Sequence, residues 1–181
     1  MVLLVLGPAL NLVAGFFWLS DSQGVTGGVL TALGITCWLI GLIALCEQLR
    51  PRAARFVAVL LPLTVFGATG GLAFSIQAIY EEMFAVSHAA AVERLNDFPL
   101  AADTLYWVCG PLFPVALVGF GVLLLRLRAA PVTVGALVVL GGLAFPLSRI
   151  TREPAIAHAV DLLLLLPFLY LGIRFPRRTS G

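Results

Sequence analysis

Long apolar stretches are the feature that most limits what this chain can fold into. Each of the six is about 18 to 25 residues long, close to the roughly 20 residues that an α-helix needs to cross the hydrocarbon core of a bilayer. Backbone groups in lipid find no water to bond to, so each stretch is predicted to be helical. The stretches cover residues 2–19, 25–46, 56–80, 104–125, 132–149 and 155–173. The sequence therefore predicts an all-α polytopic membrane protein with six transmembrane helices in one domain, residues 1–181.

The composition excludes the other common classes of protein. Hydrophobic residues make up 61% of the chain and charged residues 11%, whereas a soluble domain is about 45–50% apolar and about 25% charged. A chain of 181 residues cannot hide such an excess in one core. An ordinary soluble protein, a disordered chain and a secreted disulfide scaffold are therefore excluded. The cysteines form no CxxC pair and are interpreted as small buried hydrophobic residues: Cys37, Cys46 and Cys109.

Proline and glycine inside the stretches predict kinked and closely packed helices. Five of the six stretches contain proline, which removes a backbone donor and bends a helix. Gly24 with Gly28, and Gly67 with Gly71, show the GxxxG spacing that lets helix backbones approach closely. Such helices suit a cavity or a transporter, and they suit plain close packing equally well.

Arginine sets the expected orientation of the chain. All eleven positively charged residues are arginine, and the lack of lysine excludes a retinal or pyridoxal Schiff base and a Walker A loop. With six spans, eight of the arginines fall on the side of the two termini, and cytoplasmic loops carry such an excess. Both termini are therefore predicted to lie in the cytoplasm. The eight residues are Arg50, Arg52, Arg55, Arg126, Arg128, Arg174, Arg177 and Arg178.

The amino-acid usage also suggests a source and partners. Arginine in place of lysine, with abundant alanine, valine, glycine and leucine, suggests a GC-rich bacterial genome and hence the bacterial cytoplasmic (inner) membrane. The lipid bilayer is the expected partner, and the helices leave lipid-facing surface for a second copy of the chain or another membrane protein. No nucleic-acid partner is expected, because the arginines lie in short loops.

One long polar segment separates the third and fourth apolar stretches. Within it, Phe84, His88 and Leu95 recur at the spacing of one helical face. This pattern predicts a short amphipathic helix over residues 82–97 that lies at the outer interface of the membrane. The alternative is that the third helix continues into this segment.

Asp161 is the charged residue that stands inside a predicted span. Pro154 is a natural first residue of the sixth helix, which puts Asp161 about 10 Å below the helix start. A carboxylate at that depth costs about 2.5–3.5 kcal/mol on insertion scales, so it should face the bundle interior and have a partner. His158 lies three residues earlier on the same face. Arg149 and Arg152 end the fifth helix on the same outer side.

These polar residues predict a vestibule on the outer face of the bundle. In one interpretation they form a structural network in which His158 or an outer arginine neutralises Asp161. In another, Asp161 is the coupling carboxylate of a transporter. His88, His158 and Asp161 also suit a metal such as zinc, and two imidazoles alone suit haem. The candidate ligand- or ion-binding residues are Asp161, His158, His88, Glu81, Glu82, Arg149 and Arg152.

Part of the polar segment resembles the motifs of an intramembrane protease family. Glu81 and Glu82 resemble the start of the EExxxR motif of the CAAX-type prenyl proteases, and Phe84 to His88 fits their FxxxH spacing. The resemblance implies that Glu81 or Glu82 activates water. However, Val86 stands where the motif has arginine, and the two motifs overlap here although that family carries them on separate helices. The resemblance covers fewer than ten residues, and we assign no family on this ground.

Three classes of function follow from the sequence. The first, which we favour, is a non-enzymatic accessory or small-ligand-binding component of the membrane that has no cofactor. The second is a small transporter or channel that uses Asp161. The third is an intramembrane enzyme that depends on a metal or haem held by His88 and His158. No catalytic residue is assigned.

Overall fold

The computed structural model describes residues 1–18, 22–151 and 153–174, and its regular elements are all helices. This confirms the all-α prediction. The elements are α1 (Val2–Ala14), η1 (Gly15–Phe17), α2 (Gly24–Met83), α3 (His88–Leu95), α4 (Pro99–Ala102), η2 (Asp103–Cys109), α5 (Gly110–Arg126), α6 (Val132–Ile150) and α7 (Pro154–Arg174).

Four helices in the described part of the chain are long and apolar enough to cross a membrane. This confirms, in this coarser form, that the chain is built from membrane-type helices. One of the four is continuous through α4, η2 and α5, and α1 with η1 forms a shorter apolar helix. The four are Gly24–Met83, Pro99–Arg126, Val132–Ile150 and Pro154–Arg174.

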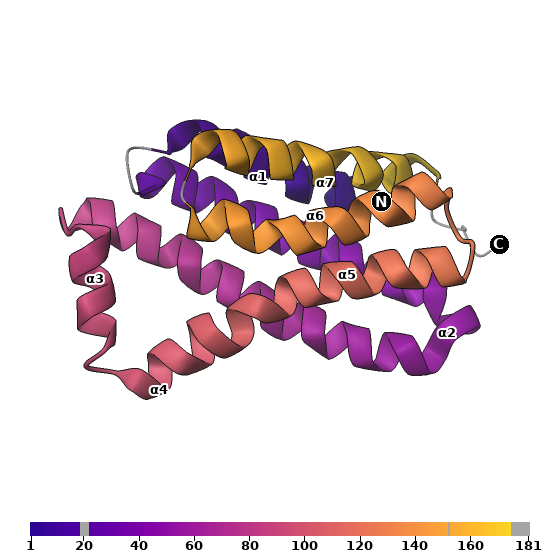
Figure 1. The fold of residues 1–181 in the computed structure, drawn as a ribbon, viewed down its shortest axis with the longest axis horizontal. Helices are drawn as coiled ribbons and strands as arrows, with labels where there is room; N and C mark the ends of the chain where they lie inside the picture. The colour runs from indigo at the N-terminus through magenta and orange to yellow at the C-terminus, as the bar shows by residue number, and fades with distance from the viewer. Residues whose placement is uncertain (19–21, 152, 175–181) are drawn as a thin grey trace.

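Helix α2 bends back on itself and has two arms, residues 24–52 and 54–83. Pro51 lacks the backbone N–H that a helix interior needs, and Ala53 has the non-helical angles φ −153° and ψ 49°. The first arm then lies beside the second, because Gly28 faces Ser75 and Ile79. Figure 1 shows the arms running in opposite directions. The polar segment between the second and third apolar stretches is therefore a sharp kink rather than a loop.

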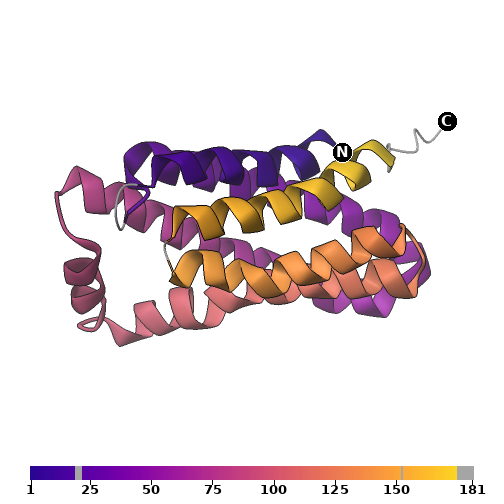
Figure 2. The ribbon, with the colours of Figure 1, turned by 45° about the horizontal axis from the view of Figure 1, so that its top comes forward.

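The helices form a ring in which each contacts the next. Helix α1 packs on the first arm of α2 and on α7; α7 contacts α6, α6 contacts α5, and α5 packs on the second arm of α2. At one end of the ring lie the start of α1, the kink of α2, the α5–α6 turn and the end of α7 (Figures 1 and 2). We call this the arginine end, because Arg50, Arg52, Arg126 and Arg128 lie there. At the opposite end, which we call the α3 end, helix α3 lies across the bundle.

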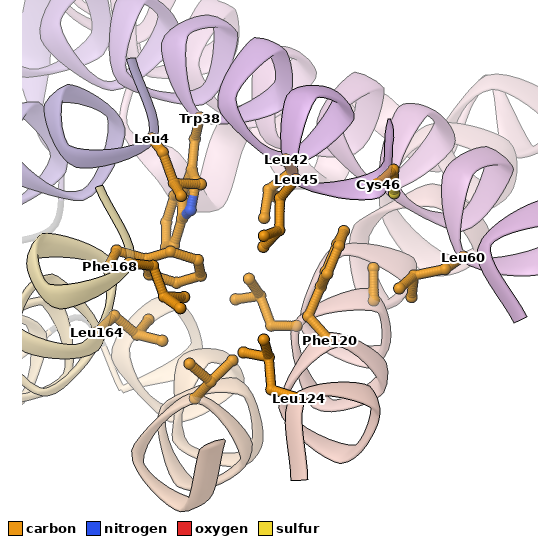
Figure 3. Packing of buried hydrophobic residues seen from close by; sticks show 14 of the residues in the cluster. Leu4, Trp38, Leu42, Leu45, Cys46, Leu60, Phe120, Leu124, Leu164 and Phe168 are labelled. Atoms are coloured by element: carbon orange, nitrogen blue, oxygen red, sulfur yellow. The ribbon is translucent and has the colours of Figure 1, made fainter. Parts of the chain in front are cut away.

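The core of the ring is built around Trp38. Its indole meets Phe113 and Phe168 edge to face, with ring centroids 5.2 Å apart in both pairs. Figure 3 shows Trp38 beside Leu4 and Phe168, with leucines of α2, α5 and α7 nearby, namely Leu42, Leu45, Leu124 and Leu164. Aromatic pairs of this kind add about 0.5–1.5 kcal/mol each beyond the area that they bury. This core links α1, α2, α5, α6 and α7 and supports the polar residues that lie closer to the α3 end.

Helix α3 is separated from α2 by a tight turn. Ala85 in that turn has φ +50°, a conformation that stops the preceding helix. Ser87 then caps the N-terminus of α3, because its Oγ accepts a hydrogen bond of 3.3 Å from the backbone N–H of Ala90. No residue of α3 is buried. The described α3 occupies only the central part of the predicted segment 82–97, and residues 82 and 83 belong to α2.

Candidate functional site

A buried ion pair joins α6 to α7. Asp161 is 1% exposed, and its Oδ1 lies 3.7 Å from Nη2 of Arg149, whose side chain is 14% exposed. The same Nη2 donates to Oδ1 of Asn11 on α1 at 3.4 Å. Asn11 is itself fixed, because its Nδ2 donates to the carbonyl oxygen of Gly7 at 3.0 Å. Three helices therefore meet at this pair, and Asp161 faces the bundle interior.

The pair is poorly hydrogen-bonded for its depth. Both carboxylate oxygens of Asp161 and Nη1 of Arg149 are buried without a hydrogen-bond partner in the described structure. The separation of 3.7 Å leaves Coulomb attraction but exceeds hydrogen-bond distance. The Arg149 guanidinium also lies 5.0 Å above the centre of the Phe145 ring, a cation–π contact that offsets part of its desolvation. Buried charges are normally paired and have all their hydrogen-bond partners. Here Nη1 of Arg149 can still donate hydrogen bonds, and both oxygens of Asp161 can still accept them.

His158 lies one turn before Asp161 and packs against η1. Its ring meets Phe16 edge to face with centroids 4.3 Å apart. Its Nδ1 lies 2.5 Å from the carbonyl oxygen of Pro154, so Nδ1 carries the proton in this hydrogen bond. Nε2 is buried and has no hydrogen-bond partner among the described residues. This geometry fixes the orientation of the ring and leaves Nε2 directed into the packed interior.

A second polar cluster lies at the end of α2. Glu81, 6% exposed, has its Oε1 2.6 Å from Nδ1 of His88 and accepts a hydrogen bond of 2.9 Å from Nε2 of Gln77. Its Oε2 accepts another, also of 2.9 Å, from the Ser22 hydroxyl. This cluster fixes the first residue of α3 against the end of α2 and the start of the first arm.

Glu82 has a different role from its neighbour. Its carboxylate accepts a hydrogen bond from the backbone N–H of Val25. Val25 lies in the first turn of α2, where backbone N–H groups have no partner within the helix. The contact therefore ties the end of the second arm to the start of the first. Both carboxylates of the protease-like segment thus have partners that stabilise the fold.

The structure divides the predicted site residues between two clusters. Arg149, Asp161 and His158 lie in the first, and Glu81 and His88 lie in the second. The two imidazoles have different partners, and the described residues contain no group of three or more histidine, cysteine, aspartate and glutamate side chains placed to hold a metal ion. Arg152 lies outside the described residues.

A cavity of about 250 Å³ lies between α2, η2, α5 and α6 at the α3 end. Its walls are mainly apolar and include the aromatic rings of Phe74, Trp107 and Phe145, and Arg149 is the one charged residue that lines it in the described structure. Gly110 also lines it, and a Cβ placed on Gly110 would meet no atom within 4 Å. Towards this end, α4 and η2 diverge from α6 (Figure 1). A second cavity of about 600 Å³ lies between the second arm of α2 and α3.

Two of these features were missed from the sequence. Asn11 is the only polar side chain in the first apolar stretch, and this would have marked it as a partner for a buried charge. Helix η2 is a π-helix, a form that is frequent at functional sites. Pro111 and Pro114 follow it and lack the N–H groups that would close normal turns. This pair of prolines is the feature of the sequence that could have indicated the irregular helix.

Comparison with known proteins adds no relative. The chain matches no family model, no curated protein and no solved structure. The functional argument therefore rests on the residues and their geometry.

Proposed function

We propose that this chain is a membrane protein that crosses the bilayer six times. The six crossings are α1 with η1, the two arms of α2, the continuous helix Pro99–Arg126, α6 and α7. At 1.5 Å per residue each arm of α2 is about 43–45 Å long, more than the roughly 30 Å of hydrocarbon. The helix of α1 and η1 is about 24 Å long and needs local thinning of the bilayer. Helix α3 then lies at the membrane interface.

The arginine end is the cytoplasmic end in this proposal. It brings together the arginines of the α2 kink and of the α5–α6 turn, as the positive-inside rule requires. The α3 end, with both polar clusters and the cavity of about 250 Å³, then faces outward. The proposed location is the bacterial inner membrane, with both termini in the cytoplasm.

Reporter fusions test this orientation. Green fluorescent protein fused after Gly181 is expected to fluoresce, and alkaline phosphatase inserted between Asp97 and Phe98 is expected to be active. The same two reporters with their positions exchanged serve as the control and are expected to be silent. An active phosphatase after Gly181 would reverse the proposed orientation.

The function that this geometry supports best is the binding of a small amphipathic ligand, without catalysis, in the outer half of the bundle. The observation that carries it is the cavity of about 250 Å³ with mainly apolar walls and a single guanidinium, that of Arg149. Ligand sites are typically concave and apolar with a few placed polar groups. The side chains of the surrounding helices do not fill this cavity. At Gly110 in particular, the absence of a side chain leaves space for a ligand.

Filling the cavity tests this function. Gly110→Leu places a side chain into space where a Cβ meets no atom within 4 Å, so the protein is expected to fold and to lose most of its affinity for an apolar probe such as ω-bromodecanol. Quenching of tryptophan fluorescence measures this binding, because Trp107 lines the cavity. Val115→Leu, on the exposed face of the same helix, is the matched control. Equal binding by both variants would contradict the proposal.

A second candidate is a transporter that uses Asp161 as its coupling carboxylate. The observation that favours it is that both oxygens of Asp161 are buried without hydrogen-bond partners, next to a cation at 3.7 Å. A group in that state can exchange its cation for a proton. In reconstituted vesicles, Asp161→Asn would then abolish proton-driven uptake of the ligand while leaving binding intact.

A further inference from the structure

We propose that the ligand is a single-chain amphiphile with a carboxylate head, and that this head competes with Asp161 for the guanidinium of Arg149. The tail would lie between Phe74, Trp107 and Phe145. This inference rests on the proposed ligand-binding function and names the class of ligand.

The sign of the ligand's charge follows from the lining of the cavity. Arg149 is the only charged residue on the described walls, and its pairing with Asp161 at 3.7 Å includes no hydrogen bond, so an anionic head is the type that this wall can still bind by hydrogen bonds. A guanidinium has five N–H donors and no acceptor. Here Nη1 makes no hydrogen bond, and Nη2 is shared between Asn11 and Asp161. An anion with two oxygens could bind this fork in the bidentate geometry that guanidinium favours.

The type of anion and the number of chains follow from size and chemistry. The group that already faces Arg149 is the carboxylate of Asp161, and a carboxylate head would reproduce its charge and shape. A cavity of about 250 Å³ is slightly smaller than the usual range for ligand pockets, which begins at about 300 Å³. It admits one alkyl chain beside the aromatic rings and leaves no room for the second chain of a phospholipid.

The ligand head and Asp161 compete because both would bind the guanidinium of Arg149. Nη1 is buried in the packed interior, so an entering head draws Arg149 towards the cavity and away from Asp161. The polar residues that then remain near Asp161 are His158 on α7 and Asn11 on α1. A buried carboxylate that loses its cation is destabilised, so part of the free energy gained at the ligand head is offset by this loss.

Two matched probes test the proposal on the full chain in detergent. ω-Bromodecanoate and ω-bromodecanol have the same tail and differ in the head, and both quench tryptophan fluorescence. The wild-type protein is expected to bind the carboxylate about tenfold to a hundredfold more tightly than the alcohol. The double variant Arg149→Gln/Asp161→Asn keeps the shape of the pair without its charges, and it is expected to bind the two probes equally. Gly110→Leu is expected to bind both weakly.

Each failure has its own signature. If the wild-type protein binds both probes equally and Gly110→Leu weakens both, the cavity binds ligands but the carboxylate inference is wrong. If Gly110→Leu changes neither, the proposed function itself is wrong. If the double variant still prefers the carboxylate tenfold, a residue other than Arg149 recognises the head, which also overturns the inference.

Discussion

Asp161→Asn is expected to destabilise the protein more than Arg149→Gln, although both break the same ion pair. Removing one partner of a buried pair leaves an uncompensated charge and costs about 3–5 kcal/mol. Without Arg149, Asp161 can become neutral by binding a proton, so the loss of stability should fall to about 1–3 kcal/mol. Without Asp161, Arg149 stays charged because guanidinium does not deprotonate in proteins. The measurement is the free energy of unfolding in mixed micelles.

The double variant Arg149→Gln/Asp161→Asn is the control for this prediction. It removes both charges and is expected to recover most of the stability that Asp161→Asn loses. If the two single variants were equally stable, the pair would not be the buried, poorly bonded contact described above.

Small substitutions at the contact between α2 and α5 are expected to have opposite effects. A Cβ on Gly67 would collide with the backbone N of Phe113, and one on Gly70 would lie 2.5 Å from the backbone N of Gly110. Backbone atoms cannot turn aside as a flexible side chain can. Gly67→Ala and Gly70→Ala should therefore cost about 1–3 kcal/mol each as the helices are pushed apart. The thermal unfolding temperature in detergent measures the loss.

Gly110→Ala is the matched control on the facing helix. The added methyl group meets no atom within 4 Å, and alanine is a better helix former than glycine by up to about 1 kcal/mol. This variant should therefore be as stable as the wild-type protein or slightly more stable. A loss at Gly110 as large as that at Gly70 would mean that the cavity is filled and that the close contact lies elsewhere.

The helical architecture could be predicted because hydrophobic length is a strong local signal. The predicted stretch 132–149 ends one residue before α6 does. The predicted stretch 155–173 starts one residue after the first residue of α7 and ends one residue before its last. The kink of α2 was harder to predict, because a charged segment of nine residues, 47–55, is compatible with a loop. The sequence also does not give the rotation of each helix about its own axis, so it could not show which glycines face a neighbouring helix. Gly67 and Gly70 contact α5, whereas Gly71 faces Ile35 in the first arm.

The candidate site could be predicted only as a set of residue types. The rule that a buried carboxylate needs a partner pointed to His158 or an outer arginine, and Arg149 lies beside Asp161. The same rule could not separate the two clusters, since their division depends on how six helical segments are arranged in space. The cavity beside Arg149 is formed by side chains from distant segments, including Phe74, Trp107 and Phe145. No local pattern in the sequence indicates that these residues lie close together in the fold.

Photolabelling tests the central claim most directly. A decanoate that carries a diazirine at the end of its tail is irradiated with the full chain, and the labelled peptides are mapped by mass spectrometry. The account predicts labelling that is concentrated on peptides containing Phe74, Trp107 or Phe145, that unlabelled decanoate competes away, and that Gly110→Leu removes. Labelling spread over exposed residues such as Leu166 and Leu169 of α7, with no competition, would contradict it.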